Sequence, residues 1–178
     1  MNYDLLLKGG HVIDPKNSVD EARDVAISKG KIAAVDAAIP VDQAAQVIDM
    51  TGLYVMPGLV DIHTHMFASS GIRNSWAGDK SILPDGFSFR SGVTTMVDTG
   101  SAGWRYFEDF RYRVIDRFDT RKFAFLNIVG AGMVANDLEQ NQADMDVDRA
   151  VAMGKEHSDV IVGMKTAHYC GTEWISVD

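Results

Sequence analysis

The chain has 178 residues, enough for one sizeable domain or two small ones, and its apolar fraction of 46% is typical of a globular protein. Its formal net charge of -8 argues against a nucleic-acid binder, because phosphate contacts need a clustered basic surface. A single cysteine excludes an internal disulfide, and no apolar run approaches the ~20 residues that span a bilayer. We therefore expect a cytoplasmic protein with small-molecule partners and no membrane contact.

The first fifty residues alternate short β-prone runs with glycine turns. The runs are YDLLL, HVID, DVAIS, KIAAVD and QVIDM. Lys29 and Gly30 separate two of them, and glycine supplies the positive φ that a tight hairpin needs. The pattern predicts a small antiparallel sheet.

After Pro57 and Gly58 the pattern changes. Apolar runs now alternate with longer helical or loop segments and fall at residues 59–62, 93–97, 123–129 and 160–164. Such runs are typical of parallel strands that are covered on both faces. Their order suits either a doubly wound sheet or half of a closed (β/α)₈ barrel, and order alone does not choose between the two.

Two of the intervening segments carry helical signals. In residues 104–118, apolar side chains at steps of three and four give one packing face, formed by Phe107, Phe110, Val114 and Phe118. Residues 146–157 begin with an aspartate that can cap a helix. They end at His157, which we expect on the surface at the helix terminus.

The strand that begins at Leu59 ends in polar groups at alternate positions. Asp61, His63 and His65 are two residues apart, so in an extended strand we expect them to point to the same side. Two imidazoles at this spacing can converge on one divalent ion at ~2.0 to 2.1 Å where the strand opens to solvent. A hydrogen-bonded structural pair is the alternative, and the local sequence leaves both interpretations open.

Lys165 follows VIVGM at the end of another apolar run. The simpler interpretation is a lysine whose ammonium group reaches the rim of the fold. Desolvation favours the neutral form of a lysine, however, and a neutral amine can react with carbon dioxide to form a carbamate. A carbamate has two anionic oxygens, so a modified Lys165 could bridge two metal ions.

The family resemblance of this chain is carried by motifs that follow one another along the sequence: DLLLKGGHVIDP, VIDMTGLYVMPGLVDIHTH, GVTTMVDTGSAG and VGMKTAHY. Together they resemble the N-terminal half of a metal-dependent amidohydrolase, close to the dihydroorotase and deacetylase-like branch. The resemblance implies an α/β fold in two domains. Residues 1–56 would form the N-terminal portion of a small β-sandwich, and residues 57–178 the first half, about four βα units, of a (β/α)₈ TIM barrel.

The resemblance also implies a metal site. His63 and His65 match the paired histidines of the first barrel strand, and Lys165 matches the carboxylated lysine of the fourth. One or two divalent ions, zinc foremost, would be the cofactors. Asp61 and Asp98 would stand beside these ligands, although a cap of the following loop is the simpler role for Asp98. His168, which lies off the strand face of Lys165, would be a substrate-loop residue.

The activity implied is hydrolysis of a C–N amide bond, in a cyclic amide or an N-acyl amino acid, by metal-activated water. The later histidines of the family and its general-base aspartate have no counterpart before Asp178, so we expect an incomplete site and no activity from this chain alone. The alternative is a non-catalytic homologue that acts as a scaffold or metal-binding assembly protein. For the full-length parent we expect a small-molecule amide substrate and a homo-oligomer.

Half a barrel would leave its first and fourth strands with unpaired edges. Unpaired edges invite pairing with other chains. We therefore expect poor solubility or self-association of the isolated chain.

Overall fold

The computed structural model describes residues 2–68, 73–135 and 137–173. The chain divides into two compact units, Met1–Pro57 and Gly58–Asp178. This division falls one residue after the boundary predicted from the sequence.

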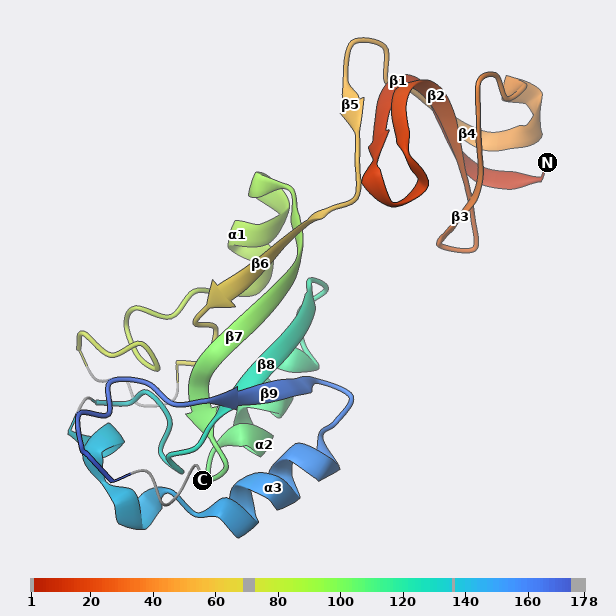
Figure 1. The fold of residues 1–178 in the computed structure, drawn as a ribbon. Helices are drawn as coiled ribbons and strands as arrows, with labels where there is room; N and C mark the ends of the chain where they lie inside the picture. The colour runs from red at the N-terminus through yellow and green to blue at the C-terminus, as the bar shows by residue number, and fades with distance from the viewer. Residues whose placement is uncertain (1, 69–72, 136, 174–178) are drawn as a thin grey trace. The chain divides into compact units, whose positions relative to one another are not determined.

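The first unit is built on one sheet of five strands (Figure 1). The strands are β1 (Tyr3–Asp14), β2 (Val19–Ser28), β3 (Lys31–Asp36), β4 (Ala44–Asp49) and β5 (Tyr54–Val55), in the order β3-β2-β1-β4 with β5 also beside β1. Two short 3₁₀ helices, η1 (Pro15–Asn17) and η2 (Val41–Gln43), lie in the connections. Leu6, Ala26, Ile39 and Ala44 form the buried core of this unit.

The predicted hairpin at Lys29 and Gly30 is confirmed. Both residues have positive φ, 52° and 71°, and β2 pairs antiparallel with β3 across them. The prediction of a wholly antiparallel sheet is wrong, because β4 and β5 run parallel to β1. The connection from β1 to β4 includes β2 and β3, so it is long enough to return the chain to the other edge of β1 in the parallel direction.

The second unit contains a parallel sheet (Figure 1). Its strands are β6 (Leu59–Thr64), β7 (Val93–Gly103), β8 (Arg121–Asn127) and β9 (Ile161–Lys165), which lie side by side in chain order. All four overlap the predicted apolar runs. Among the described strands the order shows no reversal of the kind that defines a doubly wound sheet.

Helical segments connect these strands. They are α1 (Pro84–Ser88), η3 (Phe89–Ser91), α2 (Phe107–Phe110), the π-helical η4 (Arg111–Ile115), the 3₁₀ helices η5 (Leu138–Gln140) and η6 (Gln142–Asp144), and α3 (Val147–Glu156). Phe107 and Phe110 are fully buried against Met96 and Leu126 of the sheet, which confirms the predicted packing face. None of the helices in the described ranges is both long enough and apolar enough to cross a membrane.

The helix α3 begins as predicted, because the Asp146 carboxylate accepts a hydrogen bond from the backbone N–H of Arg149 at 3.0 Å. The prediction of a surface position for His157 is only partly right. Its Nδ1 accepts a hydrogen bond from Arg111 at 3.1 Å, and its ring lies 5.3 Å from that of Phe107. Its Nε2 is buried without a hydrogen-bond partner among the described residues. Residues of α2 and η4 therefore cover the end of α3.

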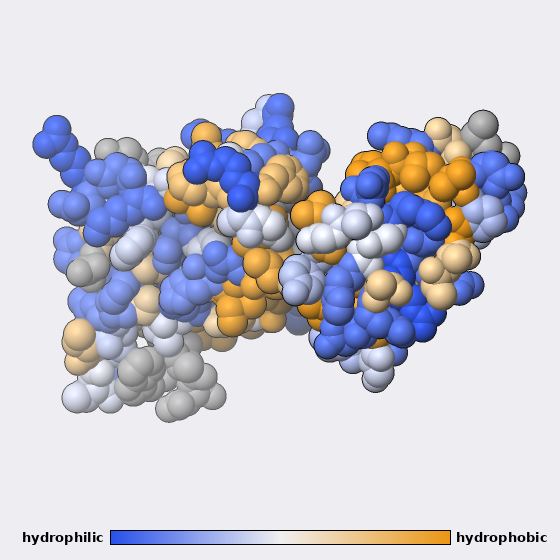
Figure 2. Space-filling view, turned by 90° about the horizontal axis from the view of Figure 1, so that it is seen from above, coloured by the Kyte–Doolittle hydropathy of each residue, from blue (hydrophilic) through white to orange (hydrophobic). Residues whose placement is uncertain are grey.

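The expectation that all four strands are covered on both faces is wrong for the two outer ones. In β6 the side chains of Val60 and Ile62 are 58% and 70% exposed, and in β9 those of Val162 and Met164 are 53% and 46% exposed. Figure 2 shows apolar side chains in orange at the surface among hydrophilic ones in blue. An outer strand has a neighbour on one side only, so its side chains lack half of their packing partners.

We expect the isolated chain to self-associate through the apolar side chains of β6. Val60→Lys should raise the monomer fraction in sedimentation velocity at micromolar concentration, because a charge on an edge strand opposes pairing. The matched control is Val41→Lys in the first unit, where the valine is 55% exposed and the association should be unchanged. A monodisperse, monomeric wild-type chain would contradict this expectation.

Candidate metal centre

The carboxyl ends of the four parallel strands lie at one edge of the sheet. This edge carries His63 and His65 at the end of β6, Asp98 and Ser101 in β7, Asn127 at the end of β8 and Lys165 at the end of β9. In the ladder between β8 and β9, Asn127 is paired with Lys165. Binding sites in parallel α/β sheets form at this edge, where loops leave the strands.

His65 is the most enclosed of the predicted ligands. Its Nδ1 lies 2.9 Å from Ser101 Oγ, and its ring stacks at a tilt with that of Trp76 at 5.1 Å. Burial, followed in order by the nearby charges of His63, Lys165 and His168, lowers the pKa of His65 to about 4. The ring of His63 lies 5.8 Å from that of His65. The fold thus brings His63 and Lys165 into electrostatic range of His65.

The side-chain stem of Lys165 lies against Gly100 of β7. Gly100 has φ of +86°, and a Cβ placed on it would lie 2.7 Å from Lys165 Cγ. Glycine supplies both the left-handed backbone and the space that the lysine stem occupies. The position of Lys165 at this edge therefore depends on the absence of a side chain at residue 100.

Gly100→Ala should destabilise the second unit by about 2 to 4 kcal/mol, because it combines left-handed strain with a clash against Lys165. Gly92→Ala is the matched control: Gly92 has φ of +75°, and a Cβ there would meet nothing within 4 Å. Urea unfolding followed by tryptophan fluorescence reports this unit, since all three tryptophans follow residue 57. Equal losses in the two variants would show that Lys165 does not occupy this space.

Asp98 is fully buried at the centre of the site region. Its Oδ2 accepts a hydrogen bond from the N–H of Met66 and its Oδ1 one from the N–H of Ser101, both at 2.7 Å. Burial raises the pKa of Asp98 to about 6, although these N–H groups favour the charged form. The contact with Ser101 agrees with the expected cap. The contact with Met66 adds a tie to the residue that follows His65.

Asp61 does not share a face with the histidines as predicted. The ladder between β6 and β7 shifts register between Asp61 and Thr64, which interrupts the strict alternation of side chains. Asp61 is paired with Met96, a residue of the buried core beneath the helices. Its Oδ1 accepts a hydrogen bond from the N–H of His63 at 3.1 Å. The Asp61 carboxylate therefore contacts the backbone of His63 and not its imidazole. A role of Asp61 beside the metal stays a prediction.

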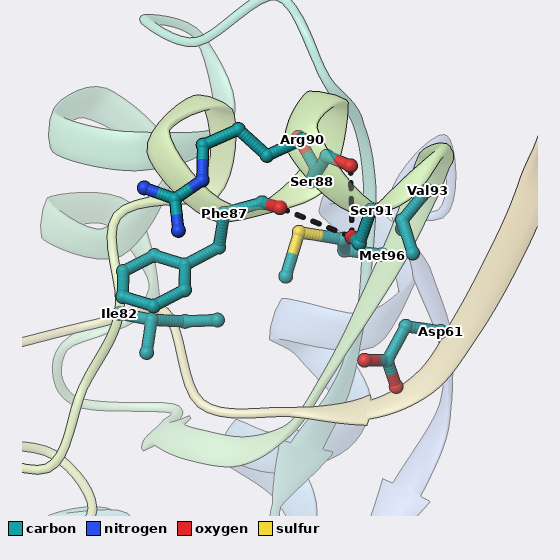
Figure 3. A pocket seen from close by; sticks show the side chains of 8 residues that line it. All are labelled: Asp61, Ile82, Phe87, Ser88, Arg90, Ser91, Val93 and Met96. Carbon is teal, nitrogen blue, oxygen red and sulfur yellow. Dashed lines mark hydrogen bonds between the residues drawn. The ribbon is translucent and has the colours of Figure 1, made fainter.

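Figure 3 shows the surroundings of Asp61. The side chain lines a cavity of about 350 Å³ together with apolar residues of β7 and the segment around α1. The lining consists of Asp61, Ile82, Phe87, Ser88, Arg90, Ser91, Val93 and Met96. None of the predicted metal ligands lines this cavity, so it is separate from the site at the strand ends.

The imidazole nitrogens at the end of β6 are ligands that suit a divalent transition metal. Ser101 holds Nδ1 of His65, and Nε2 of the same ring lies 3.5 Å from Thr99 Oγ1, a long contact that an ion can replace. A hydrogen bond to one ring nitrogen is the usual way in which a protein directs the other toward a metal. The imidazole of His63, exposed on the same strand end, supplies a second nitrogen ligand.

A second group of histidine and carboxylate atoms lies on the helices. Among the described residues, Glu108, Glu156 and His157 bring ligand atoms within 4.8 Å of one another. Arg111 donates a hydrogen bond to Nδ1 of that histidine, so a cation there would also meet a guanidinium group. We assign no metal to this group.

The sequence interpretation missed Glu139. Residues 137–146 are mostly polar, as in a loop or the approach to a helix, yet Glu139 is 1% exposed. Its Oε2 lies 2.7 Å from Nδ1 of His168, a residue that the sequence placed in a substrate loop. The isolated acidic residue gave no signal, because its partner is 29 positions away and joins it only in the folded chain.

No protein-family profile matches the chain. Among curated proteins it is 36% identical over 167 residues to a deacetylase from Agrobacterium fabrum, covering 89% of this chain and 39% of that protein. It is 46% identical over 99 residues to a dihydroorotase from Elusimicrobium minutum, covering 54% of this chain and 22% of that protein. The chain thus spans about two fifths of the length of the deacetylase.

Solved structures give the same result. A dihydroorotase superposes with a TM-score of 0.75 at 34% identity and an adenine deaminase with 0.76 at 30% identity. The matches cover 90% and 91% of this chain and 41% and 40% of those chains.

Proposed function

Because this chain is homologous to the N-terminal part of deacetylases and dihydroorotases of the amidohydrolase superfamily, we propose that it carries half of the site of a metal-dependent amide hydrolase. Residues 58–178 would form the first half of a (β/α)₈ barrel, and residues 1–57 part of a small β-sandwich. The sequential order of β6 to β9 supports the barrel. The substrate would be a small cyclic amide or N-acyl amino acid, and the full-length parent a cytoplasmic homo-oligomer.

The observation that supports this proposal is the position of His63 and His65 at the end of β6 and of Lys165 at the end of β9, at the carboxyl edge of one parallel sheet, where the charge of Lys165 lowers the pKa of His65. The two imidazoles would hold one or two zinc ions, and Lys165 would join them as a carbamate. When bound, such ions would polarise a carbonyl group and lower the pKa of bound water towards about 7.

The residues of this chain would orient that centre. Ser101 fixes the ring of His65, and Asp98 fixes the backbone on which both residues lie. Carboxylation of Lys165 requires its neutral amine: Nζ forms a bond to the carbon of CO₂ and releases one proton to solvent. The product is an anion that can serve as a metal ligand where an ammonium group cannot.

The test is the dependence of zinc binding on bicarbonate. We expect more zinc per wild-type chain when bicarbonate is present, and a carbamate signal in the ¹³C spectrum after labelling with ¹³C-bicarbonate. Lys165→Ala should abolish both effects. Lys155→Ala is the control, because Lys155 is exposed in the last turn of α3.

Two results would argue against the proposal. One is zinc binding that ignores bicarbonate in the wild type and in the Lys165 variant alike. The other is a carbamate signal that survives the loss of Lys165, which would assign it to another amine.

A further inference from the structure

The turn after β9 presents His168 in an unusual backbone conformation. His168 has φ of +57°, in the left-handed region that costs a residue with a side chain about 1 kcal/mol or more. Gln140 holds the turn: its Nε2 donates to the carbonyl oxygen of His168 at 2.6 Å, and its Oε1 accepts from the N–H of Cys170 at 2.9 Å. The strained conformation is therefore maintained by contacts from η5.

A buried carboxylate fixes the imidazole of the same residue. Glu139 Oε2 lies 2.7 Å from His168 Nδ1, and Glu139 Oε1 accepts a hydrogen bond from Asn127 Nδ2 at 3.4 Å. Burial raises the pKa of Glu139, while the contacts with His168 and Asn127 and the charge of Lys165 lower it. Glu139 is thus a buried acidic residue whose hydrogen-bond partners, His168 and Asn127, lie near the carboxyl edge of the sheet.

The pair belongs to the same edge of the sheet as the predicted metal ligands. The charge of His168 acts on His65, and that of Lys165 acts on Glu139. Asn127, which contacts Glu139, is the ladder partner of Lys165. His168 therefore stands at the mouth of the site and not on the helical side of the sheet.

The imidazole is open to solvent although its partner is not. The His168 side chain is 44% exposed and that of Glu139 is 1% exposed. With Nδ1 turned to the carboxylate, Nε2 is the atom left for another molecule. A pair that served only to hold the loop would gain nothing from an exposed ring, and strained residues with exposed polar atoms concentrate at functional sites.

A metal ligand is not the best role for this ring. Its Nδ1 is already engaged by the Glu139 carboxylate at 2.7 Å, which leaves only Nε2 for another group. When both ring nitrogens carry a proton, Nδ1–H donates to the Glu139 carboxylate and Nε2–H is a charge-assisted donor. Such a donor suits an oxygen anion.

We propose that His168, oriented by Glu139, binds a carboxylate group of the substrate at the mouth of the site. This inference rests on the proposed function and narrows its substrate class, because it favours an amide that carries a carboxylate. His168 is the residue that contacts substrate, and Glu139 is a positioning residue that acts through it.

Two small probes separate the carboxylate from the amide. N-acetylglycine has both groups, and N-methylacetamide has the amide alone. In the zinc-treated chain, N-acetylglycine should shift the ¹⁵N signal of His168 Nε2, and N-methylacetamide should not. His168→Gln should weaken N-acetylglycine binding by about tenfold, the effect of one charge-assisted hydrogen bond.

Glu139→Gln should weaken N-acetylglycine binding in the same direction while leaving N-methylacetamide binding unchanged. His168→Gln lies on an exposed turn and keeps the test valid if the buried substitution impairs folding. The control is His11→Gln in the first unit, where His11 Nε2 lies 2.6 Å from Asp20 Oδ1 in a similar pair far along the chain. This variant should bind N-acetylglycine as the wild type does.

The inference is overturned if the wild type does not bind N-acetylglycine or if His168→Gln binds it equally well. It is also overturned if His168→Gln weakens the binding of N-acetylglycine and of N-methylacetamide to the same extent. Zinc content measured on the same samples separates this failure from failure of the proposed function. Zinc retained in His168→Gln but lost in His63→Asn would leave the metal site intact as a proposal. Zinc unaffected in both His63→Asn and His65→Asn would remove the metal site, whereas a loss of N-acetylglycine binding confined to the His168 and Glu139 variants would still support the carboxylate contact.

Discussion

Replacing His65 with asparagine is expected to lower the zinc affinity of the chain by about a hundredfold or more, the upper end of what loss of a group supporting a metal ligand costs. Asparagine keeps a polar side chain but lacks the imidazole nitrogen. Competition with a chromophoric chelator measures the change. His11→Asn, which removes an imidazole from the first unit, should leave the affinity unchanged.

His65 is chosen because its surroundings prepare it for a metal. Burial holds its pKa at about 4, so at neutral pH the ring is uncharged and no proton has to leave. Ser101 fixes one nitrogen, which leaves the other in a defined direction. His63 is more exposed, and we expect His63→Asn to weaken zinc binding less.

The result that would end this interpretation is an unchanged affinity in both histidine variants. Circular dichroism should show native secondary structure in each variant, because a variant that fails to fold also loses the site. A large loss in His65→Asn with an unaltered spectrum would assign the loss to the imidazole.

Asp98→Ala is expected to lower the free energy of unfolding by about 3 kcal/mol at pH 5. The substitution leaves the buried N–H groups of Met66 and Ser101 without their acceptor and opens a cavity between two strands. Urea unfolding followed by tryptophan fluorescence measures the loss. Asp148→Ala, at an exposed aspartate in the first turn of α3, should change stability by less than about 0.5 kcal/mol.

The same pair of proteins tests the pKa of Asp98. Because the folded-state pKa of about 6 lies above the ordinary value of 3.8, the folded chain binds the proton more tightly than the unfolded chain between these values. Stability from this group is therefore present at low pH and is lost as pH rises through 6. The difference between wild type and Asp98→Ala should narrow by about 1 kcal/mol between pH 5 and pH 7. A gap that widens would show that hydrogen bonding outweighs burial.

The strands of the second unit were predictable because their apolar runs are local and long. The meeting of His65 with Lys165 was not a local property: it follows from strands 59–64 and 161–165 lying in one parallel sheet, and the family resemblance supplied that expectation. The parallel direction of β4 escaped prediction because hairpin signals describe neighbouring strands only. It depends on which edge of β1 the returning chain meets.

The failure at Asp61 has a different cause. Alternation of side chains assumes an unbroken ladder, and one register shift between Asp61 and Thr64 is enough to turn the earlier residue toward Met96. Nothing in the residues 61–64 marks that shift. The pairing of Glu139 with His168 was likewise hidden, because a pair formed across 29 positions has no signature in either segment.

The register shift in β6 divides the strand into two parts, residues 59–61 (the base) and the residues from 63 onward (the tip), which contact different surroundings. The base, with Asp61, borders the cavity beneath α1, and the tip carries both imidazoles. Asp61 links the two parts, because its carboxylate accepts a hydrogen bond from the N–H of His63. Substitutions intended to stabilise this unit should therefore be tolerated better at Leu59 and Val60, whose side chains are exposed, than at Asp61.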